Sequence, residues 1–152
     1  MNFEKGNKYM KKRMCIVLCI SIFLIFLLTI YQHNIKWRIV NIVEQNIDRY
    51  AVVADELLRG TSSTKTSLSG IKHIEGWNDV QVDFTYEYRG FGSKTSYYGF
   101  YYSVDDTPRA FQAMNVSFEL QGKGMKWNEE NSDNWCYVEK IQDNWYYFEI
   151  HF

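Results

Sequence analysis

Few side chains in this sequence stand at a spacing that supports a reaction or a metal ion. The histidines are His33, His73 and His151, and none lies near a cysteine or carboxylate at the spacing of a metal site. The chain has no G-x-S-x-G motif and no phosphate-binding glycine loop that opens a helix. The sequence therefore indicates no catalytic residues, no metal and no cofactor, and leaves open whether the protein is an enzyme.

Two groups of acidic residues are better explained by loops than by chemistry. Asp105 and Asp106 precede Pro108, and this composition predicts a turn. Glu129, Glu130 and Asp133 lie in an Asn-rich stretch whose spacing does not match a calcium-binding EF-hand loop. We expect this stretch to be a solvated loop.

Aromatic residues are the one feature that favours a binding function. If the even-numbered residues of the predicted strands face the core, the opposite face is polar on some strands but aromatic on others. Such a surface suits a sugar of a cell-wall glycan or another envelope protein. Alternatively, a loop such as residues 61–77 covers these rings and makes a second, minor core. The candidate binding residues are Tyr97, Tyr101, Trp135, Tyr137, Trp145 and Tyr147.

Two kinds of hydrophobic periodicity predict the elements that position these rings. Between residues 34 and 58 apolar side chains recur every three or four positions, which is typical of an amphipathic helix, and Gly60 is a suitable stop. From residue 80 onward the period changes to two, which is typical of half-buried strands. The predicted strands cover residues 80–89, 96–104, 114–120, 125–127, 135–141 and 145–152, the fourth of them short.

This order predicts an α+β fold in which the helix packs across an antiparallel meander of about five strands. In shape it resembles cystatin-like and NTF2-like domains, an analogy of architecture alone. The predicted division is a basic tail (1–13), a transmembrane helix (14–31), an amphipathic helix (32–60), a loop (61–76) and the sheet (77–152), with residues 33–152 forming one domain.

The transmembrane helix is predicted from an uncharged apolar run, MCIVLCISIFLIFLLTIY, over residues 14–31. At helical rise its 18 residues span roughly 27 Å, close to the hydrocarbon thickness of a bilayer. The bulky residues at its end, Leu28 to His33, do not form a signal-peptidase site. The sequence therefore predicts an uncleaved anchor.

Charge predicts the orientation of this anchor. Five cations and one acid precede the run, which favours a cytoplasmic N-terminus and a domain outside the cell membrane. The remaining chain carries 12 basic and 17 acidic residues, a balance that excludes a nucleic-acid footprint and opposes binding to anionic lipid. Cys136 is the one cysteine after the run, so the domain must be stable without an internal disulfide.

The sequence thus favours a single-pass, membrane-anchored protein whose extracytoplasmic domain binds or scaffolds an unidentified ligand. One alternative is a cell-envelope enzyme without a recognisable motif. Another is a pilin-like subunit, because an apolar helix that continues into an amphipathic one and then a meander resembles the type IV pilin plan. The chain lacks the Gly before the cleavage site and the Glu at the fifth mature position that pilin precursors carry.

Overall fold

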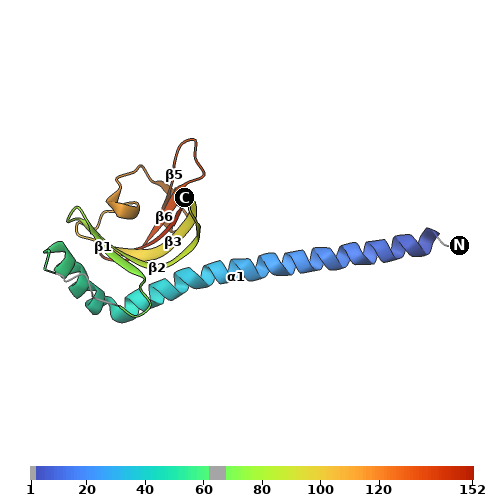
Figure 1. Cartoon of the computed structure of the whole chain (residues 1–152), viewed down its shortest axis with the longest axis horizontal. Helices are drawn as coiled ribbons and strands as arrows, with labels where there is room; N and C mark the ends of the chain where they lie inside the picture. Colours follow the sequence, from blue (N-terminus) through green and yellow to red (C-terminus); the bar gives the residue numbers. More distant parts are fainter. Residues whose placement is uncertain (1–2, 62–67) are drawn as a thin grey trace. The chain divides into compact units, whose positions relative to one another are not determined.

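A computed structural model describes residues 3–61 and 68–152, with side chains for residues 14, 16–30, 35–61 and 68–152. The chain forms two compact units, Met1–Ile35 and Lys36–Phe152. The fold is α+β and consists of one long helix and a seven-stranded antiparallel sheet (Figure 1). The elements are α1 (Phe3–Leu58), β1 (His73–Trp77), β2 (Gln81–Phe91), β3 (Lys94–Ser103), the 3₁₀ helix η1 (Phe111–Ala113), β4 (Glu119–Gln121), β5 (Gly124–Asn128), β6 (Trp135–Gln142) and β7 (Trp145–His151).

The first unit consists of the N-terminal part of α1. Within the described residues, one helix is long and apolar enough to cross a membrane, and none of the side chains in its apolar stretch is buried. Leu18, Phe23 and Leu28 are each about 60% exposed. Water would be a poor solvent for such a surface, and hydrocarbon would suit it.

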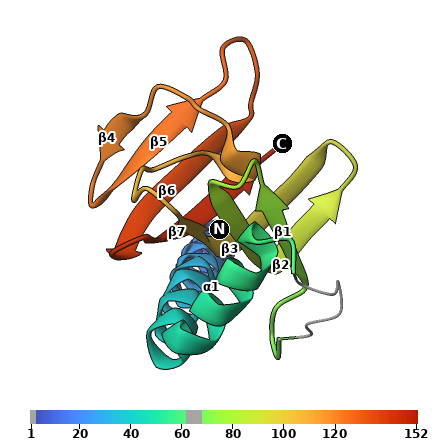
Figure 2. The same ribbon diagram turned by 90° about the vertical axis from the view of Figure 1, so that its left-hand side faces the viewer.

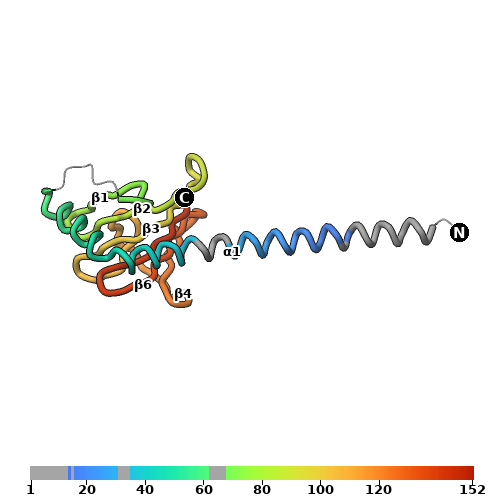
Figure 3. The backbone as a smooth tube through the Cα atoms, turned by 90° about the horizontal axis from the view of Figure 1, so that it is seen from below, coloured from blue at the N-terminus to red at the C-terminus, as the bar shows by residue number. Residues whose placement is uncertain are grey.

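In the second unit, residues 36–58 of α1 cover one face of a curved sheet (Figures 2 and 3). Tyr50 of the helix packs against Phe84 and Phe100, and these two rings stack on each other at 4.8 Å between centroids. The strand order is β1-β2-β3-β7-β6-β5-β4, so β7, the last strand of the chain, lies in the middle of the sheet.

A segment that carries η1 covers the opposite, outer face of the sheet. Its Ala110 is fully buried, and Phe111, Val116 and Phe118 pack against a core of sheet residues. The sequence predicted a strand over residues 114–120. In the structure only Glu119–Gln121 joins the sheet there, because the apolar residues before it are used to cover the outer face. That core contains Tyr101, Cys136, Val138, Tyr146, Phe148 and Ile150.

The sheet has seven strands, and the prediction of about five is wrong. The edge strand β1 was missed, and of the strand predicted over residues 114–120 only the end belongs to the other edge strand, β4. The predicted loop ran to residue 76, whereas residues 73–77 pair with β2 as β1. That strand reads HIEGW, which lacks a clear alternation, and β4 has only three residues, all exposed. An edge strand has one neighbour and so needs less apolar patterning than an internal strand.

Candidate functional site

The six aromatic residues that the sequence predicted as one binding face lie on both faces of the sheet. Tyr101 of β3 pairs with Tyr146 of β7, and Phe100 pairs with Tyr147. Even-numbered residues of β3 therefore share a face with odd-numbered residues of β7, so the prediction of one aromatic face is wrong. Tyr97 and Tyr101 face the outer side, while Trp135, Tyr137, Trp145 and Tyr147 face the helix side.

Three of these six rings are buried. Tyr101, Trp145 and Tyr147 are each at most 3% exposed, while Tyr97, Trp135 and Tyr137 are partly exposed. Tyr147 and Trp145 lie under the helix, and the Tyr101 hydroxyl accepts a hydrogen bond from the backbone N–H of Arg109 at 3.0 Å. Among the described residues, α1 therefore covers one face of the sheet and the η1 segment covers the other. A binding role for the partly exposed rings stays a prediction.

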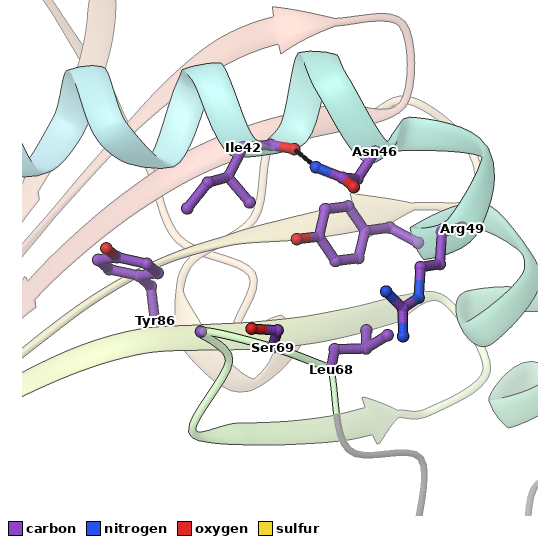
Figure 4. A pocket seen from close by; sticks show the side chains of 8 residues that line it. Ile42, Asn46, Arg49, Leu68, Ser69 and Tyr86 are labelled. Atoms are coloured by element: carbon purple, nitrogen blue, oxygen red, sulfur yellow. Dashed lines mark hydrogen bonds between the residues drawn. The ribbon is translucent and has the colours of Figure 1, made fainter.

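A pocket of about 360 Å³ opens where α1 and β2 both depart from regular geometry (Figure 4). In the helix, Asn46 has non-helical angles (φ −132°, ψ 22°), and its side-chain amide donates to the Ile42 carbonyl at 3.0 Å. In the strand, the register shifts between Thr85 and Glu87, which leaves Tyr86 as a bulge residue. We call this the kink–bulge pocket; it is lined by Ile42, Asn46, Arg49, Tyr50, Leu68, Ser69, Gly70 and Tyr86.

The lining of the kink–bulge pocket is half apolar and carries one charge, that of Arg49. Figure 4 shows the Arg49 guanidinium beside Leu68. No hydrogen bond or ion pair of the Arg49 side chain is found among the described residues. A second cation, Arg38, lies 5.6 Å from the Tyr86 ring centroid. With one cation in its lining, a second against the Tyr86 ring and no acidic lining residue, the pocket suits an anion that also has an apolar body.

On the helix side of the sheet, near the start of β3 and the end of β7, polar side chains of the two strands are linked by a series of hydrogen bonds. Ser96 of β3 lies opposite His151 of β7, and the Ser96 Oγ is 2.8 Å from the His151 Nδ1. The His151 Nε2 is 2.9 Å from the Glu149 Oε1, and the Trp135 ring stacks on the imidazole at 4.0 Å. Serine, histidine and carboxylate in this order form the type of chain that activates a nucleophile.

The sequence could not predict these hydrogen bonds, because Ser96 and His151 are 55 residues apart and only the register of β3 on β7 brings them together. The one local sign was the spacing of Glu149 and His151, which places both side chains on one face of a strand. Both β3 and β7 are internal strands, so their backbone N–H groups are used in the sheet. The site therefore lacks the pair of free backbone donors that stabilises an oxyanion in acyl transfer.

The outer face contains a buried carboxyl group. Asp83 is 3% exposed; it accepts a hydrogen bond from the Gln81 side-chain amide at 2.6 Å and one from the backbone N–H of Gln112 at 3.1 Å. Burial raises the pKa of Asp83 to about 6, although both hydrogen bonds act in the opposite direction. Gln112 has φ 60°, so this hydrogen bond holds the η1 segment in a left-handed turn.

The acidic pair Asp105 and Asp106 organises a turn, as the sequence predicted. The Arg109 guanidinium donates to both oxygens of Asp105, at 2.7 and 2.6 Å, and holds the pKa of that carboxyl well below its usual range. Asp106 accepts from Lys140 and from the backbone of Asn144, which also lowers its pKa. These contacts tie the β3 exit to the β6–β7 hairpin.

The remaining sequence candidates carry no site in the described part of the chain. No three His, Cys, Asp or Glu residues there could hold a metal ion, and His33 lies outside the described side chains. His73 pairs with Glu75 at an exposed position. Cys136 is fully buried, and burial raises the pKa of its thiol to about 12, so it is a core residue rather than a nucleophile.

No protein-family model, curated protein or solved structure matches this chain.

Proposed function

We propose that this protein is a single-pass, membrane-anchored binding protein whose folded domain lies outside the cytoplasm and takes its ligand in the kink–bulge pocket. The anchor is supported by the apolar stretch of α1, whose described side chains are exposed. The orientation is supported by the five cations before residue 14. A reporter fused to the C-terminus tests it: alkaline phosphatase, which is active only outside the cytoplasm, should be active.

The kink–bulge pocket is the observation that carries the binding function. A kink at Asn46 and a bulge at Tyr86 each lower the stability of the element that contains them. Both irregular residues, Asn46 and Tyr86, line the same cavity. Natural proteins retain such departures mostly at functional sites.

The ligand class follows from the lining. Arg49 offers a planar pair of donors to a carboxylate, and the half-buried side chains of Ile42 and Tyr86 offer apolar surface to an apolar body. An organic carboxylate with an aromatic or aliphatic body fits this set. A cell-wall glycan or an envelope protein, the partner classes that the sequence suggested, would bind there through a carboxylate group of this kind.

Fluorine NMR with 4-(trifluoromethyl)benzoate tests this assignment on the full chain in lipid nanodiscs. The probe resonance should broaden, and Arg49→Gln should reduce its affinity by about tenfold, the effect of losing one charge-assisted interaction of about 1.4 kcal/mol. The matched control is Arg59→Gln, since Arg59 lies on the same helix but pairs with Asp55 and does not line the pocket. Equal affinity of the two variants would exclude Arg49 as the anion-binding residue.

A second candidate function, hydrolysis in the cell envelope, is favoured by the chain of Ser96, His151 and Glu149. Geometry supports binding better than catalysis, because these three hydrogen-bonded residues have no free backbone donors for an oxyanion beside them and lie outside the kink–bulge pocket. A fluorophosphonate probe distinguishes the two functions. A covalent adduct on Ser96 that is lost in His151→Asn would establish a nucleophile, and an unmodified Ser96 would exclude one.

A further inference from the structure

The edge of the sheet beside the kink–bulge pocket is only partly covered by β1. That strand pairs with β2 as far as Thr85, and the Lys72 N–H donates to the Thr85 carbonyl at 2.8 Å. The residues before Lys72 form a turn, in which the Ile71 N–H donates to the Leu68 carbonyl. Within the described part of the chain, residues 86–91 of β2 therefore pair with β3 alone. We call this stretch the open edge of β2.

Hydrogen bonds of β3 show which backbone groups face the open edge. The Thr95 carbonyl accepts from the Phe152 N–H, so the backbone of Thr95 points away from β2. Backbone direction alternates along a strand, and the backbone of Tyr97 therefore also points away from β2. Tyr88 lies opposite Tyr97 and exchanges no hydrogen bond with it. The N–H and the carbonyl of Tyr88 are thus directed to the side without a strand.

The open edge is long enough to hold another extended chain. Its six residues correspond to about 20 Å of strand, whereas β4, the edge strand at the other margin of the sheet, has three residues. Unpaired backbone groups of an edge are a template for strand addition. Tyr88 is 55% exposed, so its ring can contact a side chain of an added strand.

The direction of an added strand decides which of its ends reaches the kink–bulge pocket. A peptide antiparallel to β2 runs from the level of Phe91 to that of Tyr86, and its C-terminus arrives at a residue of the pocket lining. Tyr50 packs on Phe84, so Arg49, its neighbour in the chain, lies past Tyr86 in the same direction. Figure 4 shows Tyr86 and Arg49 at opposite ends of the pocket. The peptide carboxylate would thus reach Arg49, whereas a parallel peptide would bring a cationic N-terminus to it.

Charge along this edge also suits a peptide carboxylate. Arg49 lines the pocket, which has no acidic lining residue. Arg38 lies 5.6 Å from the Tyr86 ring centroid, and the Lys72 ammonium lies 5.3 Å from that of Tyr88. The pocket has a volume of about 360 Å³, which is sufficient for the carboxylate and an apolar side chain of the last peptide residue.

We infer that the kink–bulge pocket and the open edge of β2 form one site for the C-terminal segment of another polypeptide. The segment adds to β2 as an antiparallel strand and places its terminal carboxylate on Arg49. This inference rests on the proposed function, because the carboxylate occupies the same pocket. It selects a protein over a glycan as the partner, since a glycan has no regular series of backbone N–H and carbonyl groups to pair with a strand.

Fluorescence anisotropy on the full chain in nanodiscs tests the inference. The probe is a hexapeptide of alternating threonine and valine that ends in phenylalanine and carries fluorescein at its N-terminus. The peptide acid should bind, and its C-terminal amide should bind about tenfold more weakly. Two isomers, N-methylated on alternate amides, report backbone pairing. Because alternate amides of an added strand face β2, one isomer should lose about tenfold in affinity and the other should bind like the parent peptide.

A pair of variants locates the pairing on β2. Tyr88→Pro removes the N–H that faces the open edge, at a position where an edge strand tolerates proline. Tyr88→Ala is the matched control, because it removes the same ring but keeps the N–H. The proline variant should bind the peptide acid about tenfold more weakly than the alanine variant, and both should bind 4-(trifluoromethyl)benzoate like the parent chain.

The outcomes separate this inference from the proposed function. If 4-(trifluoromethyl)benzoate binds but the peptide acid does not, or if the two N-methylated isomers bind equally, strand addition is overturned and the pocket remains a site for small carboxylates. Equal peptide affinities of the two folded Tyr88 variants would exclude the open edge of β2 as the place of pairing. If the parent chain binds neither probe, the proposed function fails, and the peptide site fails with it.

Discussion

The buried carboxyl of Asp83 makes the stability of the domain depend on pH in an unusual direction. Its pKa is about 6 in the folded protein against 3.8 for the ordinary carboxyl, because burial penalises the charged form. The folded state therefore binds the proton more tightly than the unfolded state. The stabilising contribution of this proton is complete below pH 3.8 and is lost as the pH rises through 6.

The magnitude follows from the two pKa values. Between pH 7 and pH 5 the folded carboxyl changes from mostly ionised to mostly protonated, while the unfolded carboxyl stays ionised. Linkage then gives a gain of about 1.3 kcal/mol in the free energy of unfolding at pH 5. For a domain of this size, such a gain raises the melting temperature by about 4 °C.

Thermal unfolding of the full chain in detergent, followed by near-ultraviolet circular dichroism, measures this change. Asp83→Asn is the matched control, because its side chain is similar in shape but does not titrate. The difference in stability between the two proteins should shift by about 1.3 kcal/mol from pH 7 to pH 5 in favour of the parent chain. If both proteins responded equally to pH, Asp83 would not be the titrating group, and burial would not raise its pKa to about 6.

Two further predictions concern packing in the middle of the sheet. In Gly99→Ala the new methyl group would lie 2.3 Å from the Phe84 carbonyl oxygen and 2.7 Å from the Phe148 ring, so we expect a loss of about 2–4 kcal/mol by chemical denaturation. Gly122→Ala, at a turn with open space but φ 62°, should lose only about 1 kcal/mol, and equal losses would show that the sheet can relax around residue 99. Deletion of residues 148–152 should abolish cooperative melting, because it removes most of a strand that lies between β3 and β6. A truncated chain that melts at the parent temperature would contradict the central position of β7.

Those elements whose pattern is local could be predicted from the sequence. Residues 14–31 carry no charge, and a run of this kind has few stable environments outside a bilayer or a core. The strict alternation in residues 80–89 predicted β2, and the pairs of aromatic runs predicted β3, β6 and β7. The edge strand β1 was missed and the edge strand β4 was placed with the wrong bounds, since a strand with one neighbour needs little apolar pattern.

The sequence by itself determined that an apolar helix precedes an acidic, aromatic α+β domain, because hydrophobic period and charge act over a few neighbouring residues. Tertiary structure alone decided which residues share a face. The pairing of β3 with β7 joins segments more than 40 residues apart, and a register change of one residue would move every side chain of β7 to the other face. That pairing splits the six predicted aromatic residues between two faces and brings Ser96 to His151. The kink–bulge pocket arises in the same way, since it exists only where the helix crosses the strand at residues 46 and 86.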